Sequence, residues 1–555
     1  MRTKEICVDP SKSAAEVSGV KPRLRTDWLL LAGFCGFLFF YGLAYFGLIG
    51  ADEPRYAQVA REMLARHDWI TPTLGGTPWL EKPPLYYWQA MLSYRAFGVS
   101  DWAARLPSAI DATLMVIAIY FFFRRFRPGA ELDAALMTAA AAGIVGFARA
   151  ASMDMALAAT FTIALLAWYA WYEGGARLCL WIAYASLALG MLAKGPVAPF
   201  LAALVVSAFA VAKRDYNVFR RILSTWGIII SCVIALPWYV LVQLRNSDFF
   251  RAFILQHNLQ RFSSNLYHHR EPFWYYIPVA LLALLPWTVF SVSAVAETVR
   301  VWWSERAEML KSEDALSVFL LIWLLVPLIF FSLSQSKLPG YILPALPAGT
   351  MLLADYVRRH AASDDRPGLI ALALHALVAA APVFPAVLLG QILLLHHIAW
   401  GNATLVASIV TAALAIGILL TLCTPAGLRM LRFVTLIPVV LAVAAVLRIY
   451  APVLDNRLSA RPLAIELSKL EFKALPLAVF RVRRETEFGL AFYCNETINR
   501  YETGQVPKEE HIVVVPAGAH QELADQLAGR RALYLGSFTP QRLDYYWISA
   551  QTAVP

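Results

Sequence analysis

Stretches of about twenty apolar residues alternate with short polar connections along most of the chain, and they end near residue 451. A helix of that length crosses the roughly 30 Å hydrocarbon layer of a membrane, so the pattern predicts an all-α polytopic membrane protein. We expect about 13 transmembrane helices, near residues 28–49, 106–123, 130–148, 154–172, 178–193, 197–212, 225–244, 275–295, 316–334, 341–357, 368–390, 402–422 and 433–451.

The pattern changes after Pro452 to short segments that are typical of a water-soluble domain. The segments "LAVFRV", "LAFYC", "HIVVVP" and "RALYLGSF" predict strands, and "AHQELADQLAG" predicts a helix. We therefore divide the chain into a leader (1–27), a transmembrane part (28–451) and a small C-terminal α/β domain (452–555). The first apolar run is too long for the core of a signal peptide, so we interpret it as a retained helix.

The composition supports a membrane protein and argues against a nucleic-acid partner. Fifty-nine per cent of the 555 residues are hydrophobic and 15% are charged, which lies outside the usual range of soluble globular proteins. The formal net charge of +10 would suit nucleic acid only if the charges were clustered, and instead they lie in alternate loops. The six cysteines form no CxxC pair and indicate no disulfide framework.

The basic loops predict how the chain is oriented in the membrane. Together with the N-terminal leader, they mark the cytoplasmic side by the positive-inside rule. They contain Arg124, Arg125, Arg127, Lys213, Arg214, Arg300, Lys311, Arg358 and Arg359. An odd number of helices then places the C-terminus on the periplasmic side, together with two long connections at 50–105 and 245–274. Long structured loops are usually functional.

Ionisable residues gather in four clusters near the predicted outer ends of the helices, where the cost of charge near a membrane requires a reason. The clusters are "DEPRY", "WLEKPPLYYW", the pair "SMDMAL" and "MLAKGP", and the loop "QHNLQRF…HHREPFWYY" with "SQSKLPGYILP". Their candidate residues are Asp52, Glu53, Arg55, Tyr56, Glu81, Lys82, Asp154, Lys194, His257, Arg270, Lys337 and Tyr341. Cations beside carboxylates could hold a phosphate while a carboxylate orients or activates a second substrate.

Each cluster also has a purely structural explanation. Asp52 could cap a helix that begins there, since Asp is a favoured N-cap and Pro54 suits a first helical turn. Glu81 and Lys82 could form an exposed ion pair of small consequence, and Lys194 could extend to the membrane interface. The histidines favour interfacial hydrogen bonding over metal binding. We assign three further polar residues to topology or helix packing: Arg105, Arg149 and Asp111.

The sequence resembles the C-type membrane glycosyltransferases, specifically the bacterial lipid A aminoarabinose transferases, which are related to the protein O-mannosyltransferases. The matching motifs span residues 50–347 in order: "DEPRYA", "REML", "DWITP", "EKPPLYYW", "SMDM", "LAKG", "QHNLQRF", "HREPFWYY" and "KLPGYILP". The resemblance implies a C-type glycosyltransferase fold with a periplasmic active site. It implies transfer of 4-amino-4-deoxy-L-arabinose from undecaprenyl phosphate to a phosphate of lipid A, which modifies lipopolysaccharide and confers resistance to polymyxin.

The resemblance also implies roles for individual residues. Asp52, Glu81 and Asp154 are the expected catalytic carboxylates. The expected substrate-binding residues are Arg55, Tyr56, Lys82, Lys194, Arg270, Lys337 and Tyr341. A divalent metal such as zinc would have Glu81 and His257 as ligands, and no organic cofactor is expected. The expected partners are the undecaprenyl-phosphate-linked donor, lipid A and membrane lipids, and the expected oligomeric state is a monomer of the inner membrane.

Two other functions remain open from the sequence. A sister transferase would use another polyprenyl-linked sugar, such as galacturonic acid or an amino hexose, and the several acidic residues favour an amino sugar over a carboxylated one. A transporter of a lipid-linked substrate would also place polar residues in helices. The ionisable clusters lie at one face instead of the midplane, and no inverted repeat is apparent, so the transferase is favoured.

Overall fold

The structure is a computed structural model that describes residues 24–253, 271–304, 315–362, 367–470, 475–504, 506–527 and 529–551. Up to residue 449 the described residues are mainly helical. The helices are α2 (Leu24–Cys35), α3 (Asp52–Ala65), α4 (Leu85–Phe97), α5 (Asp101–Phe126), α6 (Glu131–Ala140), α7 (Ala142–Ala148), α8 (Met153–Gly174), α9 (Arg177–Lys194), α10 (Val197–Lys213), α11 (Val218–Arg221), α12 (Thr225–Arg245), α14 (Tyr276–Ala283), α15 (Thr288–Ser304), α17 (Ala315–Ser332), α18 (Leu346–Ala362), α19 (Leu369–Ala380), α20 (Val383–Val387), α21 (Leu389–Leu395), α22 (Asn402–Leu422) and α23 (Gly427–Ile449). A short antiparallel hairpin, β1 (Thr73–Leu74) and β2 (Thr77–Pro78), lies between α3 and α4.

Eight of the described helices are long and apolar enough to cross a membrane, and two bent helix pairs raise this number to ten. The prediction of an all-α, multi-pass membrane protein is therefore confirmed. Helices occupy every segment in which one was predicted, but some are shorter than a typical span, such as α10 with 17 residues. The predicted count of about 13 spans is not confirmed.

Several predicted helices are not continuous, including the one over 130–148, which is bent by 66° between α6 and α7. Two others show different causes. The first, predicted over 28–49, is helical only as far as Phe40, and residues 41–51 form an irregular segment that we call the strap. Gly42 and Gly50 have positive φ angles there, a conformation that glycine adopts without steric cost. The second, predicted over 275–295, is broken between α14 and α15 with a bend of 119°. Pro286 lies in this break, and proline cannot donate a helical hydrogen bond.

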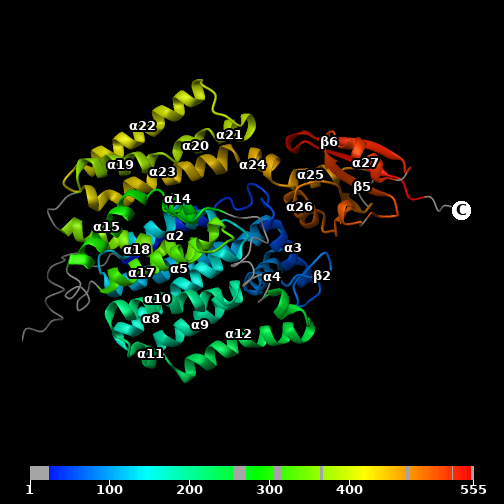
Figure 1. Cartoon of the computed structure of the whole chain (residues 1–555). Helices are drawn as coiled ribbons and strands as arrows, with labels where there is room; N and C mark the ends of the chain where they lie inside the picture. Colours follow the sequence, from blue (N-terminus) through cyan, green and yellow to red (C-terminus); the bar gives the residue numbers. More distant parts are fainter. Residues whose placement is uncertain are drawn as a thin grey trace, which may run out of the picture.

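Helix α8 packs against α5 and α9 in the helical part of the molecule (Figure 1). Of the residues in the apolar stretch of α8, 78% are buried inside the protein, compared with 17% for the corresponding stretch of α22. Aromatic rings fill the space around α8, including Trp168 against Phe319 of α17 at 5.5 Å between centroids. The apolar residues that α22 leaves exposed, such as Ile409 and Leu420, suit contact with lipid.

Two of the predicted cytoplasmic loops meet at Asp355, near the end of α18. Arg127, which follows α5, donates from Nε to Asp355 Oδ1 at 2.9 Å, and Arg358 Nη2 lies 3.0 Å from the same oxygen. Asp101 and Arg105 occupy the opposite end of α5. The basic segment at Arg127 and the residues Asp101 and Arg105 therefore lie at opposite ends of this long helix.

The C-terminal residues form a five-stranded sheet with helices, which agrees with the predicted α/β character of this part of the chain. The elements are α24 (Ala451–Leu458), α25 (Arg461–Leu467), β3 (Leu477–Val479), α26 (Arg484–Cys494), β4 (Asn499–Arg500), β5 (His511–Pro516), α27 (His520–Gln526), β6 (Ala532–Phe538) and β7 (Leu543–Ile548). The strand order is β4-β3-β5-β7-β6, with β3 parallel to β4 and β5, and β7 antiparallel to β5 and β6. Ile512 and Val514 face α25 and α26, whereas Val513 and Val515 face α27.

Three of the four predicted strands are confirmed, because "LAVFRV", "HIVVVP" and "RALYLGSF" contain β3, β5 and β6. The helix predicted in "AHQELADQLAG" is α27. The strand predicted in "LAFYC" is wrong, since these residues end helix α26. Thr486, Gly489, Leu490 and Tyr493 recur at helical spacing, and the first two lie before the five letters that suggested a strand.

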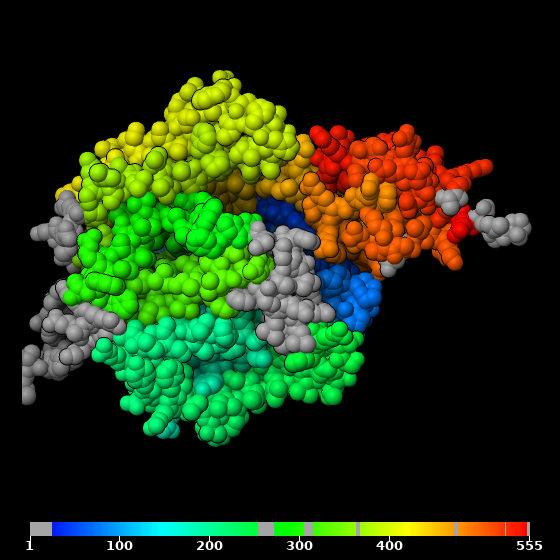
Figure 2. Space-filling view, viewed as in Figure 1, coloured from blue at the N-terminus to red at the C-terminus, as the bar shows by residue number. Residues whose placement is uncertain are grey.

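The C-terminal part lies at one end of the molecule, next to α3 and α4 (Figure 1). The space-filling view shows it, in orange to red, against the blue N-terminal segments (Figure 2). Helix α26 packs on α3, and Arg61 of α3 donates to the carbonyl oxygen of Phe492 at 2.7 Å. Four residues form the apolar face of α3, which is buried against α4 and α26: Tyr56, Val59, Ala60 and Met63.

Candidate functional site

Helix α3 begins at Asp52, directly after the strap. Ala51 occupies the N-cap position, so Asp52 is the first residue of the helix and not its cap. The Asp52 side chain is 59% exposed, and its Oδ1 lies 2.5 Å from Nη2 of Arg55 one turn later. An accessible carboxylate beside a cation therefore marks the start of this helix.

Glu53 has a different environment from its neighbour Asp52. Its buried carboxylate accepts hydrogen bonds from the amides of Ile49 at 2.9 Å and Ala151 at 2.7 Å. The guanidinium of Arg105, which is 1% exposed, donates to the same carboxylate at 2.7 Å. Arg105 also donates to three strap carbonyl oxygens, those of Leu43, Phe46 and Gly47. Glu53 thus joins α3 to α5 and to the residues before α8.

Three aromatic rings surround the guanidinium of Arg55. The Arg55 Cζ atom lies 5.1 Å from the ring centroid of Tyr56, 5.2 Å from that of Trp79 and 5.6 Å from that of Phe488. Phe488 belongs to α26 of the C-terminal part. Cation–π contacts of this kind hold a cation in place while leaving its N–H groups available to an anion.

Electrostatic effects connect Arg55 with carboxylates of other clusters. Burial alone would lower the pKa of Arg55, but Tyr56, Asp52 and Glu81 oppose this effect and raise the pKa above its usual range. Burial raises the pKa of the Tyr56 phenol, and the carboxylates of Asp52 and Asp154 raise it further. At neutral pH Arg55 is therefore charged, and Tyr56 carries a proton that it can donate.

Asp154 and Lys194 form a second charged pair, between the start of α8 and the end of α9. Lys194 Nζ pairs with Asp154 Oδ1, and Ser152 Oγ donates to Asp154 Oδ2 at 2.7 Å. The same ammonium lies 4.8 Å from the ring centroid of Tyr341. Lys82 lies near enough for its positive charge to interact with the Asp154 carboxylate. The fold therefore brings together residues of "DEPRY", of "WLEKPPLYYW" and of the pair "SMDMAL" and "MLAKGP", with Tyr341 of the fourth cluster.

Lys337, another predicted substrate-binding residue, is buried and holds backbone groups. Its Nζ donates to the carbonyl oxygens of Ser334 at 2.6 Å and Glu271 at 3.0 Å. These contacts tie the turn before the 3₁₀ helix Pro339–Ala345 to the residues that precede α14. Its predicted role in substrate binding stays a prediction.

His257 and Arg270 lie outside the residues that the structure describes. Within the described part of the chain, no three His, Cys, Asp or Glu side chains gather as metal ligands. Of the two predicted ligands only Glu81 is described, and it acts electrostatically on the Arg55 cation. The divalent metal stays a prediction.

Three buried donor atoms at the site find no acceptor among the described residues: Arg55 Nε, Trp79 Nε1 and the Tyr87 hydroxyl. Tyr87 is fully buried, and its ring centroid lies 6.4 Å from that of Tyr56. Buried donors almost always have a partner in a folded protein. Unpaired donors next to Arg55 suit a ligand with several acceptor oxygens, such as a phosphate.

Sequence reasoning missed several residues of this site. Trp79 and Tyr87 lie in the motif "WLEKPPLYYW", in which only Glu81 and Lys82 were predicted as site residues, so their signal was present. Phe488 lies just before the segment "LAFYC", far from Arg55 in the chain, and no local sequence pattern connects the two residues. Arg105 and Arg149, which we had assigned to topology or helix packing, both donate to carbonyl oxygens of the strap. Arg149 also donates to the carbonyl oxygen of Leu38, which precedes the strap.

Comparison with known proteins adds to this geometry. The family model described as dolichyl-phosphate-mannose-protein mannosyltransferase matches residues 81–241. The undecaprenyl phosphate-alpha-4-amino-4-deoxy-L-arabinose arabinosyl transferase of Pseudomonas aeruginosa (strain UCBPP-PA14) is 34% identical over 330 residues, which are 58% of this chain and 58% of that protein. The chain therefore spans less than two thirds of the length of the curated relatives that it matches.

Solved structures match nearly the whole chain. The crystal structure of ArnT from Cupriavidus metallidurans bound to undecaprenyl phosphate has a TM-score of 0.75 and 22% identity, and covers 96% of this chain and 99% of that one. The apo structure of the same protein gives a TM-score of 0.74 over 94% of this chain and 98% of that one, again at 22% identity. The protein is thus a multi-pass membrane protein with the C-type glycosyltransferase fold. Within that class, the resemblance to the aminoarabinose transferases related to the O-mannosyltransferases is confirmed.

Proposed function

We propose that the protein is a glycosyltransferase that moves 4-amino-4-deoxy-L-arabinose from undecaprenyl phosphate to a phosphate group of lipid A. The reaction takes place at the periplasmic face of the bacterial inner membrane, and its product confers resistance to polymyxin. Two findings support the proposal: the relatives carry the name of undecaprenyl phosphate-aminoarabinose transferases, and the structural neighbour binds undecaprenyl phosphate.

The observation that carries the proposal is the composition of the site around Arg55. An arginine held by aromatic rings pairs with an accessible carboxylate at Asp52. Lys194 pairs with Asp154, whose charge acts on the neighbouring Tyr56. Arg55 Nε, Trp79 Nε1 and the Tyr87 hydroxyl have no acceptor in the described part of the chain. A polyprenyl phosphate would supply acceptor oxygens to these donors and negative charge to the cations.

The transfer exchanges one glycosidic bond for another. An oxygen of the acceptor phosphate attacks the anomeric carbon of the sugar and forms the new C–O bond. The bond between that carbon and the donor phosphate oxygen breaks, and its electron pair leaves with undecaprenyl phosphate. Because a phosphomonoester has a second pKa near 6, the acceptor is already largely dianionic at neutral pH. Removal of a proton therefore contributes little, and stabilisation of the leaving phosphate contributes most.

The side chains of the site take separate roles in this reaction. Arg55 and Lys82 stabilise the charge that develops on the leaving phosphate, with Tyr341 and Arg270 as further contacts. Asp52 pairs with the ammonium of the sugar or stabilises positive charge at the anomeric carbon. Asp154 holds Lys194 in place by their ion pair. The different environments of the two neighbouring carboxylates support Asp52 as the catalytic one, because Glu53 is buried and paired with Arg105.

The orientation proposed for the chain places residues 1–27 and the basic loops in the cytoplasm, and residues 452–555 with the site in the periplasm. The meeting of Arg127 and Arg358 at Asp355, at the other end of α5 from Asp101, supports this arrangement. It brings the site to the periplasmic face, where the proposed transfer takes place. The protein acts as a monomer.

Purified protein in phospholipid vesicles, supplied with undecaprenyl-phospho-aminoarabinose and lipid A, tests the function. We expect mass spectrometry to detect lipid A with one added aminoarabinose, together with free undecaprenyl phosphate. Lipid A that keeps its mass while the donor persists would contradict the proposal. In cells, a different added mass that depends on the gene would identify a sister transferase.

Lys82→Ala tests the phosphate contact separately from the chemistry. A hydrogen bond to a charged group contributes about 1.5–3 kcal/mol, so the variant should bind undecaprenyl phosphate about tenfold more weakly or worse. Lys508→Ala, which removes an exposed lysine of the C-terminal part, serves as the matched control. Equal affinity of the two variants, measured by equilibrium binding of the lipid, would return Lys82 to the role of a surface ion pair.

A divalent metal held by Glu81 and His257 is a separate proposal. It predicts that purified protein contains a stoichiometric metal such as zinc, and that Glu81→Gln lowers this content. Metal analysis of the protein after dialysis against a chelator measures both quantities. Full transfer activity in protein freed of metal would exclude a catalytic role for the ion.

A further inference from the structure

The C-terminal part of the chain holds the strap that leads into Asp52. Three successive amide groups of the strap donate to side chains of three different helices. The bonds run from Gly47 to Asp455 Oδ1 at 2.8 Å, from Leu48 to the Tyr493 hydroxyl at 2.7 Å, and from Ile49 to Glu53 Oε2 at 2.9 Å. Two of the three acceptors thus come from α24 and α26, beyond the transmembrane part.

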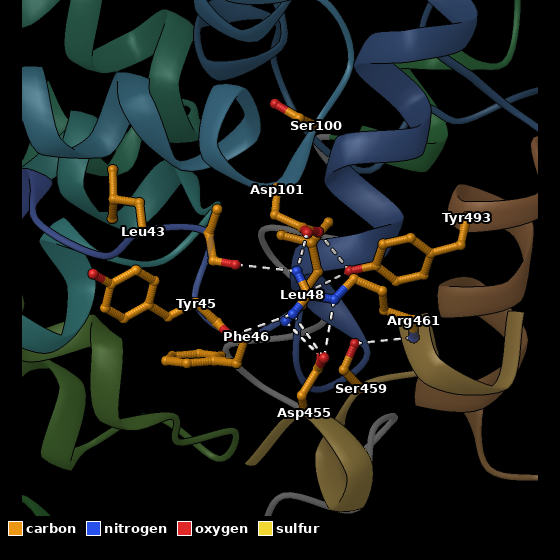
Figure 3. A network of polar contacts seen from close by, with 12 residues as sticks. Leu43, Tyr45, Phe46, Leu48, Ser100, Asp101, Asp455, Ser459, Arg461 and Tyr493 are labelled. Carbon is orange, nitrogen blue, oxygen red and sulfur yellow. Dashed lines mark hydrogen bonds and ion pairs between the residues drawn. The ribbon is translucent and has the colours of Figure 1, made fainter. Parts of the chain in front are cut away.

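Arg461, the first residue of α25, binds the strap from its carbonyl side (Figure 3). Its guanidinium donates to the carbonyl oxygens of Ala44 at 3.1 Å and Tyr45 at 3.3 Å. The same group donates to Asp455 Oδ2 at 2.7 Å and to Asp101 Oδ2 at 2.8 Å. One guanidinium therefore joins the strap, α24 and the start of α5.

Asp101 completes this network on the side of the transmembrane helices. Its Oδ1 accepts a hydrogen bond from the Tyr493 hydroxyl at 2.5 Å, and its Oδ2 accepts from Arg461 (Figure 3). The strap passes directly over these groups, since a Cβ atom at Gly47 would collide with Ser459 Oγ and with the Tyr493 hydroxyl. The contact between the two parts of the chain is therefore close and polar.

The position of Asp52 depends on what holds the backbone on its two sides. On its C-terminal side, Glu53 is bound by Arg105 and the amide of Ala151, both in the transmembrane part. On its N-terminal side, the strap amides of Gly47 and Leu48 are bound by the C-terminal part. Asp52 itself is largely exposed, so it is placed by these backbone anchors and not by packing of its own side chain.

We propose that Asp455, Arg461 and Tyr493 are positioning residues of the transfer reaction, because they hold the strap and thereby fix Asp52 at the start of α3. The inference rests on the proposed function. It assigns the C-terminal part a role inside the reaction site, which agrees with the approach of Phe488 to Arg55. A displacement of about 1 Å in a reacting group can reduce a rate about 100-fold, so small movements of the strap matter.

Arg461→Met, in the full-length protein in vesicles, tests the inference. We expect kcat to fall about 10- to 100-fold. The affinity for undecaprenyl phosphate should stay within about threefold, because Lys82 and the rings around Arg55 are not part of the network. Hydrogen exchange should show faster exchange at the amides of Gly47 and Leu48. Tyr493→Phe, which removes one oxygen atom, should change the same quantities in the same direction by a smaller factor.

Arg530→Met is the matched control, because Arg530 also binds backbone carbonyl oxygens but only within the C-terminal part: those of Pro507, Glu509 and Ser549. We expect it to leave kcat and strap exchange unchanged. Equal loss of kcat in both arginine variants would overturn the inference, as would wild-type kcat or wild-type strap exchange in Arg461→Met. If Arg461→Met does not fold, the comparison of Tyr493→Phe with Arg530→Met decides.

The experiment also separates this inference from the proposed function. If the wild-type protein transfers no sugar, the proposed function fails, and the positioning role fails with it. If the wild-type protein transfers aminoarabinose while Tyr493→Phe and Arg461→Met retain its kcat, only the positioning role is excluded.

Discussion

Asp52 and Glu53 are neighbours in the chain, but the structure gives them opposite environments. The Asp52 carboxylate is exposed and paired with Arg55 on the same helix turn. The Glu53 carboxylate is buried and paired with Arg105 of α5. An exposed pair contributes little to stability, whereas a broken buried pair leaves an uncompensated charge. Substitutions at the two positions should therefore affect different properties of the protein.

Asp52→Asn should abolish transfer without unfolding the protein. We expect kcat to fall about 100-fold or more, since a group that stabilises charge in the transition state is lost. Binding of undecaprenyl phosphate should persist, because Arg55 and Lys82 remain. Asp525→Asn, an equivalent change at an exposed position of α27, should keep full activity. Transfer at the wild-type rate by Asp52→Asn would remove this carboxylate from the mechanism.

Glu53→Gln should instead destabilise the protein, by about 3 kcal/mol or more, because Arg105 stays buried without its carboxylate. Thermal unfolding in detergent, followed for this variant and for Asp52→Asn side by side, measures the difference. If Glu53→Gln unfolds at the same temperature as Asp52→Asn and the wild-type protein, the buried pair does not stabilise the fold.

At the scale of elements, the site is assembled from ends of helices and from segments between them. The start of α3, the start of α8 and the end of α9 supply Asp52, Asp154 and Lys194. The strap that precedes α3 has little regular structure, so side chains bind its backbone groups in place of a helical ladder. The arginines Arg105, Arg149 and Arg461 take most of this task.

Gly47→Ala should loosen the strap, since the new methyl group would collide with Ser459 Oγ and the Tyr493 hydroxyl. We expect a loss of stability of about 1–3 kcal/mol, typical of overpacking, together with slower transfer. Gly417→Ala is the control, because nothing lies within 4 Å of a Cβ at that position of α22. Alanine favours a helix over glycine, so the control should be neutral or slightly more stable in thermal unfolding.

At the scale of the whole molecule, the two ends of α5 carry different chemistry. The end near Asp101 meets the C-terminal part and the candidate site, and the end near Arg127 meets Asp355 and the basic loops. By the positive-inside rule, this polarity supports the proposed orientation, in which the site lies in the periplasm. The rule depends on charge placement alone, so it can be tested without any measurement of activity.

Alkaline phosphatase fused after residue 551 should be active in cells, because this enzyme needs the disulfides that form outside the cytoplasm. The same reporter fused after Arg214, in a basic loop, should be inactive. The reverse pattern would invert the proposed topology and would move the site to the cytoplasmic face.

The sequence by itself determined the kind of molecule and the motifs of its site. Apolar runs of membrane-spanning length predicted the helices, and alternating segments predicted β3, β5 and β6, because hydrophobic periodicity is set locally. Periodicity gave a wrong prediction for the end of α26, because the five residues of "LAFYC" are too few to show a helical repeat. It also did not predict the breaks near Gly42 and Pro286, which lie inside apolar runs.

Only the tertiary structure decided which polar residues work together. It separated Asp52 from Glu53 and joined Asp154 to Lys194. It also brought Phe488 of the C-terminal part to Arg55 of α3, and Arg461 to Asp101 at the start of α5. These pairings connect residues that are far apart in the chain, and one sequence contains no local signal for them. Burial and hydrogen bonding across the fold, which follow from packing, fix what each charged group binds.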